Sequence, residues 1–215
     1  MVGHLLQYHS CVRKLLDLAA SGALGHLQYI TSNRLNLGKI RREENALWSF
    51  APHDLSVILS LVGDRLPGRV TCTGGSYLTG GVADTTLMTM RFDGDVRAHI
   101  YVSWLNPFKE QKLTAIGSDG IVVFDDTLPW DRKLLLYRDH LILGEGGVPE
   151  PNKMPGERVE VSEEEPLHCE CAHFLEVTAN RTVPRTDGRE GLRVLRALHA
   201  AQASLDRDGE PVDID

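Results

Sequence analysis

Residues 96–104, with the sequence VRAHIYVSW, decide the fold class because they have the pattern of a β-strand with two different faces. Every second residue of this stretch, beginning with the first, is apolar: Val96, Ala98, Ile100, Val102 and Trp104. Side chains alternate between the two faces of a strand, so the order predicts one buried face and one polar face. The Asp-Gly pairs at 93–94 and 119–120 indicate hairpin turns. We therefore expect strands through most of residues 70–143.

Four segments have the apolar spacing of helices, at about residues 10–21, 52–62, 166–180 and 188–205. Helix, strand, helix, a run of hairpins and two final helices predict an α+β fold with a large, mainly antiparallel open sheet and helices packed on one face. The other face of such a sheet needs cover. A second copy of the chain would provide it, and we expect a homo-oligomer through the open sheet face.

Composition excludes several classes of protein. The 215 residues are 42% hydrophobic and 25% charged, with a formal net charge of −7. An acidic chain lacks the dense basic face that nucleic-acid binding requires, so we expect no nucleic-acid partner. No apolar run reaches the roughly 18 residues of a membrane helix, and the start is too short and too polar for a signal peptide. These features predict a cytoplasmic protein with no membrane partner and with free thiols.

The first residues are unusual for the start of a domain. Residues 2–6, VGHLL, have the composition of a short buried strand, and a helix follows at once. Such a strand has no neighbour to pair with. We interpret it as the last strand of a sheet whose other strands are absent.

His53 is the first candidate for chemistry. It follows Pro52, which is favoured in the first turn of a helix. The positive end of the helix dipole there favours a neutral imidazole, which can take a proton from an alcohol. The alternative interpretation is a buried histidine with a structural role, next to Asp54 as a first-turn acid.

A basic segment is the second candidate. Arg34 and Asn36 lie on one face of an expected strand, and Lys39 and Arg41 follow in a loop. Such a group could hold a diphosphate or a carboxylate. The alternative is a solvated surface balanced by the acidic pair that follows at 43–44.

Other motifs are weak or missing. Cys169 and His173 share a helix face but would need further ligands to bind a metal, and a helix packed through its thiol is the simpler interpretation. The sequence contains no G-x-G-x-x-G after a strand and no G-x-x-x-x-G-K-[ST]. It therefore offers no recognisable cradle for a nucleotide or a dinucleotide.

Several stretches together resemble the C-terminal half of the Gfo/Idh/MocA oxidoreductases, and most of all the branch that oxidises nucleotide sugars at C3. They are, in chain order, GHLLQYH at 3–9, SGALG at 21–25, RLNLGKIR at 34–41, WSFAPHD at 48–54, VSWLNPFKEQ at 102–111 and PRTDGREG at 184–191. The resemblance covers essentially the whole chain. Ser49 departs from the aspartate that many members carry four residues before the histidine.

The resemblance implies a two-domain enzyme in which a Rossmann domain binds NAD(P). Residues 1–22 would be a remnant strand and crossing helix of that missing domain, and residues 23–215 would form the substrate-binding and oligomerisation domain. His53 would be the acid/base. Arg34, Asn36, Lys39, Arg41 and Trp48 would line a sugar or sugar-nucleotide ligand.

Two functions follow from this resemblance. In the first, the chain is the substrate half of an NAD(P)-dependent sugar oxidoreductase, it binds no cofactor of its own and it is inactive alone. In the second, it is a non-enzymatic sugar-nucleotide-binding or dimerisation module. An in-frame G-x-G-x-x-G upstream of the Met1 codon would favour the enzyme.

Overall fold

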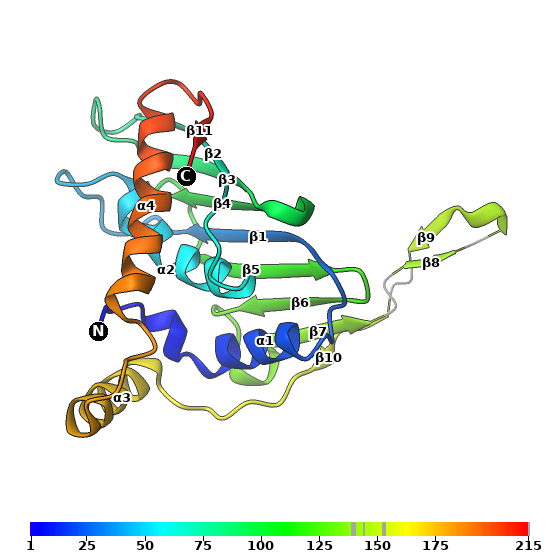
Figure 1. Cartoon of the computed structure of the whole chain (residues 1–215). Helices are drawn as coiled ribbons and strands as arrows, with labels where there is room; N and C mark the ends of the chain where they lie inside the picture. Colours follow the sequence, from blue (N-terminus) through cyan, green and yellow to red (C-terminus); the bar gives the residue numbers. More distant parts are fainter. Residues whose placement is uncertain (139–140, 144, 152–153, 215) are drawn as a thin grey trace.

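The computed structural model describes residues 1–138, 141–143, 145–151 and 154–214, and its centre is one open sheet (Figure 1). All neighbouring strands of this sheet are antiparallel except β1 and β4, which are parallel. In spatial order its strands are β10 (Glu157–Arg158), β7 (Leu134–Arg138), β6 (Gly120–Asp125), β5 (Glu110–Gly117), β1 (Leu27–Leu35), β4 (Arg97–Ser103), β3 (Thr85–Arg91), β2 (Arg69–Gly75) and β11 (Val212–Asp213).

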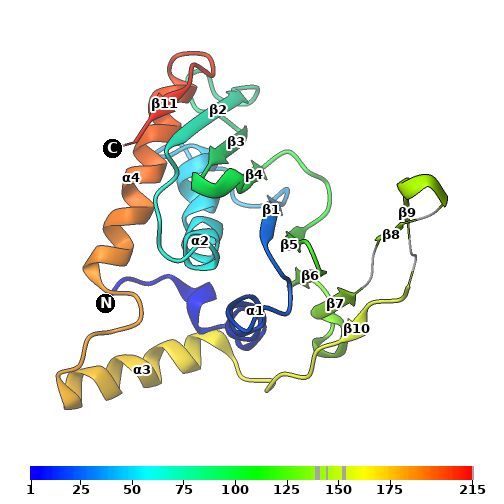
Figure 2. The same cartoon turned by 45° about the vertical axis from the view of Figure 1, so that its right-hand side comes forward.

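Helices cover one face of the sheet, as Figures 1 and 2 show. The helices are α1 (Ser10–Ala20), α2 (Ala46–Leu61), α3 (Pro166–Asn180) and α4 (Gly188–Leu205). Of these, α1, α2 and α4 pack on the strands, while α3 lies beyond them against the short 3-10 helix η1 (Leu5–Tyr8). The predicted α+β class, with a large, mainly antiparallel open sheet covered on one face, is confirmed.

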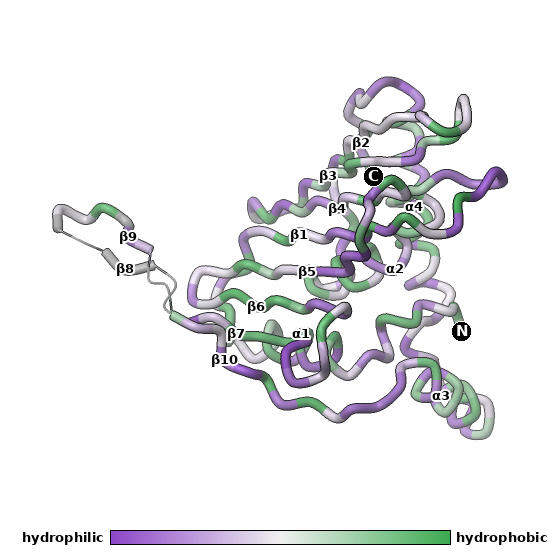
Figure 3. The backbone as a smooth tube through the Cα atoms, turned by 180° about the vertical axis from the view of Figure 1, so that it is seen from behind, coloured by the Kyte–Doolittle hydropathy of each residue, from purple (hydrophilic) through white to green (hydrophobic). Residues whose placement is uncertain are grey.

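The alternating stretch forms the predicted two-faced strand. On β4, the side chains of Ala98, Ile100 and Val102 are at most 1% exposed and face the helices. His99 and Tyr101 lie between them on the uncovered face, which Figure 3 shows from behind with the hydropathy of each residue. Gly94 makes the turn between β3 and β4 with a φ of 75°, a conformation that favours glycine.

The remaining elements are short. The 3-10 turns are η2 (Asp93–Asp95), η3 (Trp130–Arg132) and η4 (Glu145–Gly147). A separate antiparallel hairpin, β8 (Leu141–Leu143) with β9 (Pro149–Pro151), stands away from the main sheet in Figures 1 and 2. Strand β8 thus pairs with β9, whereas β7 pairs with β6 and β10. None of the helices in the described ranges has the length and apolarity needed to cross a membrane.

The predicted strand at residues 2–6 is wrong. The backbone N–H of Val2 donates to the carbonyl of Thr186 at 2.8 Å, and the N–H of His4 folds back onto the carbonyl of Val2. Residues 5 and 6 already belong to η1. The segment is apolar because it packs beside α4 and the loop before it, not because it joins a sheet.

The predicted start of the second helix is also wrong. Helix α2 begins at Ala46, because the Asn45 side chain accepts a hydrogen bond from the N–H of Trp48 at 3.1 Å and so caps the helix. Pro52 lies in the interior of the helix. A proline there lacks the N–H that would bond to the carbonyl four residues earlier, so it interrupts the helix ladder just before His53.

Candidate functional site

His53 is half-buried on the third turn of α2 and not in its first turn. The dipole effect falls off within the first turn of a helix, so it does not favour a neutral imidazole at this position. A neutral imidazole is favoured for other reasons. Burial lowers the pKa of His53, the charge of Arg34 lowers it further, and the charge of Asp54 opposes the shift. The expected chemistry, a neutral base, thus keeps a physical basis.

Arg34 and Asp54 form a buried ion pair beside His53. Nε of Arg34 lies 2.7 Å from Oδ2 of Asp54, and Nη2 lies 3.1 Å from Oδ1. Ser32 completes the group by donating to Oδ1 at 2.9 Å. Asp54 is therefore the ion-pair partner of Arg34, a candidate substrate-binding residue, and it is not in the first turn of α2.

The other two basic candidates lie in the exposed loop after β1. Lys39 and Arg41 line an open cavity of about 540 Å³, together with the residues between them and the acidic pair Glu43 and Glu44. Arg41 forms an ion pair with Glu44 at 2.7 Å. Asn36 is half-buried at the start of the loop, where its backbone N–H donates to the carbonyl of Ser103.

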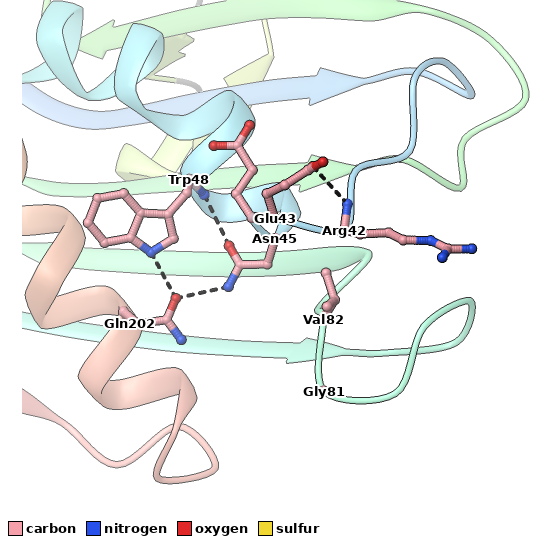
Figure 4. Close-up of a pocket in the computed structure, with 8 residues that line it drawn as sticks. Arg42, Glu43, Asn45, Trp48, Gly81, Val82 and Gln202 are labelled. Atoms are coloured by element: carbon pink, nitrogen blue, oxygen red, sulfur yellow. Dashed lines mark hydrogen bonds between the residues drawn. The ribbon is translucent and has the colours of Figure 1, made fainter.

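Trp48 lies in a second cavity of about 460 Å³ (Figure 4). Its indole Nε1 donates to Oε1 of Gln202 at 2.9 Å, and Nδ2 of Asn45 donates to the same oxygen at 2.9 Å. Gly81 and Val82 form another wall. The edge of the indole is thus fixed by α4, in a cavity that also includes part of the basic loop.

The structure brings only part of the predicted site together. Trp48 also lines an apolar cavity of about 470 Å³ with Val2, His4, Pro52 and the first turns of α4. Trp48 therefore borders both the end of the basic loop, at Arg42, and Pro52, the residue before His53. Arg34, Asn36 and His53 line none of these three cavities, and Lys39 and Arg41 line only the cavity of the exposed loop.

Two contributors were missed by sequence reasoning. Asn45 had a usable signal, because asparagine directly before an apolar helical pattern is a preferred N-cap. Gln202 had none. It lies 154 residues from the indole that it binds, and only the packing of α4 against α2 places it there.

The metal hypothesis gains no support from the described residues. Among them, no three histidine, cysteine or acidic side chains are grouped to hold an ion. Nε2 of His173 instead accepts a hydrogen bond from the backbone N–H of Arg185 at 3.1 Å.

The helix N-termini do not fit a dinucleotide pyrophosphate. In all four α-helices of the described ranges, a side chain of the chain itself already accepts a first-turn N–H. The caps of α3 and α4 are the acidic residues Glu165 and Asp187, which would repel a phosphate. The helix starts of the described ranges thus offer a pyrophosphate fewer free N–H groups, and two of them an unfavourable charge.

The chain is similar in fold to several crystal structures. It matches UDP-N-acetylglucosamine 3-dehydrogenase from Acidithiobacillus ferrooxidans with a TM-score of 0.79 and 23% identity, over 96% of this chain and 62% of that one. An inositol dehydrogenase homolog from Azotobacter vinelandii, complexed with NADH and myo-inositol, gives 0.73 and 16%, over 99% and 64%. Aldose-aldose oxidoreductase from Caulobacter crescentus, complexed with glycerol, gives 0.78 and 17%, over 100% and 63%.

These likenesses concern the fold alone, and the chain spans less than two thirds of the length of each of these proteins. No curated protein matches it in sequence. The family model of the GFO/IDH/MocA C-terminal domain, however, matches residues 12–123, more than half of the chain. The chain therefore belongs to the GFO/IDH/MocA family, whose C-terminal domain it carries.

Proposed function

We propose that this chain is the substrate-binding and oligomerisation half of an NAD(P)-dependent nucleotide-sugar oxidoreductase of the cytoplasm. The observation that carries the proposal is the position of Trp48. It lines one cavity with Arg42, Glu43 and Glu44 at the end of the basic loop, and a second cavity with Pro52, the residue before His53. The basic groups of the loop suit the diphosphate of a sugar nucleotide, and the aromatic ring of Trp48 suits its sugar ring. A neutral imidazole suits the hydroxyl that reacts.

Each residue has a distinct role in this proposal. Lys39 and Arg41 hold the diphosphate through charge-assisted hydrogen bonds. Trp48 packs against the apolar face of the sugar, and Asn36 donates to its hydroxyl groups. His53 takes the proton of the hydroxyl that is oxidised, as a general base.

The dinucleotide belongs to a part of the enzyme outside this chain. Its chemistry is to accept the hydride from the sugar carbon. No capped helix start of the described residues fits its pyrophosphate. We further propose that residues 1–22 belong to the dinucleotide-binding half by descent and residues 23–215 to the substrate half.

The uncovered sheet face suits a second copy of the chain. Leu87 on β3 lies opposite Tyr101 on β4, and Tyr29 on β1 contacts His99 through a hydrogen bond of 3.1 Å. Leu87 and Tyr29 are 42% and 37% exposed. Large amphipathic side chains of this kind are typical of interfaces.

Titration calorimetry with UDP-N-acetylglucosamine tests the sugar-nucleotide proposal. We expect binding by the chain, weaker binding of UMP or of N-acetylglucosamine alone, and a loss of about tenfold in Lys39→Gln and in Arg41→Gln, as for one charged hydrogen bond. Arg132→Gln is the matched control, since Arg132 is an exposed arginine on η3 that lines none of the three cavities described above. A chain that binds none of these ligands, or equal losses in the control, would contradict the proposal.

A further inference from the structure

The Arg34–Asp54 ion pair lies in an enclosed position between the sheet and α2. The side chains of Arg34 and Asp54 are only 11% and 4% exposed. Besides its two bonds to Asp54, Arg34 uses Nη1 to donate to the side-chain oxygen of Gln111 at 3.1 Å, in the amide orientation that also lets Gln111 donate to Asp126. Three nitrogens of the guanidinium therefore already have acceptors within the protein.

A buried ion pair of this kind is not explained by stability. Moving two charges out of water costs about as much as their attraction returns, and a well-packed apolar pair is often as stable or more so. The pair is, however, adjacent to His53 in the chain, because its carboxylate belongs to the next residue of α2, and its charges act on the imidazole.

The turn that carries His53 is fixed by its backbone. Ser56 donates its hydroxyl to the carbonyl of His53 at 2.9 Å, and Gln7 in turn donates to the carbonyl of Ser56 at 2.8 Å. The His53 ring itself has no hydrogen bond to any residue of the described ranges. The backbone that carries the imidazole is thus fixed by these hydrogen bonds. The ring nitrogens have no partner among the described residues and can bind a substrate hydroxyl.

We propose that Arg34 and Asp54 are positioning residues for His53: together they anchor the turn of α2 that carries it to β1, and Arg34 places a fixed positive charge beside the imidazole. This inference rests on the proposed function, in which His53 acts as a base. It assigns Arg34 a role through His53 instead of direct contact with the substrate.

The charges around His53 come from three elements. Arg34 on β1 and His4 in the N-terminal segment disfavour its protonation, and Asp54 on α2 favours it. Burial is the largest cause of the lowered pKa of His53, and Arg34 and His4 act in the same direction. Removal of either member of the pair must therefore move this pKa, and the two removals must move it in opposite directions.

Histidine titration by NMR on the full chain tests this opposition without any ligand. The His53 signal is identified by its loss in His53→Gln. We expect Arg34→Met to raise the pKa of His53, Asp54→Asn to lower it, and the double variant to lie between them. Arg34→Lys, which keeps the charge, restores most of the wild-type value.

A structural effect alone would give a different result. Loosening of α2 exposes the imidazole to water, and exposure raises its pKa in both single variants. Shifts in the same direction, or no shift in Asp54→Asn, would overturn the proposal. If Arg34→Met does not fold, the direction of the His53 pKa shift in the nearly isosteric Asp54→Asn decides between the two explanations. The melting temperature of this variant checks that it is folded. Because no substrate is present, this outcome is independent of the calorimetric test of function.

Discussion

His4 and Glu190 form a buried pair that joins the start of the chain to the first turn of α4. Nδ1 of His4 lies 2.8 Å from Oε1 and 2.7 Å from Oε2 of Glu190, and both residues are less than 9% exposed. A carboxylate only accepts hydrogen bonds, so Nδ1 carries the hydrogen. The pair spans 186 positions of sequence and closes the N-terminal segment onto α4.

We expect Glu190→Gln to destabilise the chain by about 2 kcal/mol, because a buried hydrogen bond to a charged carboxylate is replaced by a weaker one to a neutral amide. The measurement is the free energy of unfolding in urea. Glu157→Gln is the matched control, since Glu157 makes a 3.5 Å pair with Arg138 at an exposed site, where such pairs contribute little. Equal effects of the two substitutions would show that the His4 pair is not a structural anchor.

Acid stability depends on Asp126. Burial opposes its ionisation, but hydrogen bonds from His9 and from Lys133, whose Nζ lies 2.6 Å from Oδ1, lower the pKa of Asp126 to about 2. An unfolded aspartate titrates near pH 3.9, so the unfolded chain takes up this proton first. The stabilisation is therefore complete above about pH 4 and is lost as the pH falls towards 2.

Asp126→Asn removes this dependence. We expect its unfolding free energy to be lower than that of the wild type at pH 6 and the difference to shrink between pH 4 and pH 2. Asp131→Asn, at an exposed site on η3, should leave the wild-type dependence intact. A constant difference between Asp126→Asn and the wild type over this range would assign the acid sensitivity to other carboxylates.

Features that depend on neighbouring residues in the chain were predicted correctly more often than features that depend on distant ones. The alternation in β4 fixed the sheet face because both faces are set by the strand itself, and the bounds of α3 and α4 were predicted as they are observed. The predicted start of α2 is wrong because proline is favoured in a first turn but is also found in the interior of this helix, which begins after its cap at Asn45. Residues 2–6 were misassigned because apolar composition does not distinguish a strand from a segment packed on a distant helix.

The candidate site was predictable only as a set of residue types. The pattern indicated Arg34 and His53 separately, but the ion pair with Asp54 arises from the contact between β1 and α2. The same holds for Gln202, which fixes the indole of Trp48 from a helix near the end of the chain. Long-range packing, and not local propensity, determines which candidates meet.

Substitution of His53 tests its role as a base. In a protein that combines this chain with a dinucleotide-binding domain, His53→Asn should lower kcat by roughly 10²–10⁴ with a smaller change in KM, because general-base catalysis contributes about this much. The low pKa of His53 predicts that activity in the wild type persists below pH 6.5, the ordinary value for histidine. Near wild-type turnover in the variant would assign His53 to packing.

A charged residue on the uncovered sheet face should separate an oligomer. We expect light scattering of the wild type at micromolar concentration to give a dimer or larger, and Leu87→Arg to shift it towards a monomer. Ala20→Arg is the control, because Ala20 is exposed on α1, on the covered side of the sheet. A monomeric wild type would contradict the proposed interface, as would an equal effect of the two arginines.

The chain by itself should bind neither NAD⁺ nor NADP⁺ at micromolar concentration and should have no dehydrogenase activity. A pyrophosphate is held by free N–H groups at a helix start, usually after a glycine turn that follows a buried strand. In the helices of the described ranges, side chains of the chain occupy those starts, and two of the four caps are acidic.

Titration calorimetry with both dinucleotides measures this expectation, with UDP-N-acetylglucosamine as the ligand that the same sample should bind. Two causes can exclude the pyrophosphate from the start of α4: the acidic charge of the cap and the occupation of the N–H groups. Asp187→Asn separates them, since it removes the charge but keeps a cap that can accept the N–H groups of Arg189 and Glu190. If the variant also fails to bind, occupation of the helix start is sufficient to exclude the pyrophosphate. Micromolar binding of either dinucleotide by the wild type would mean that this half contains a cofactor site. The proposal that cofactor and substrate bind to different halves of the enzyme would then be wrong.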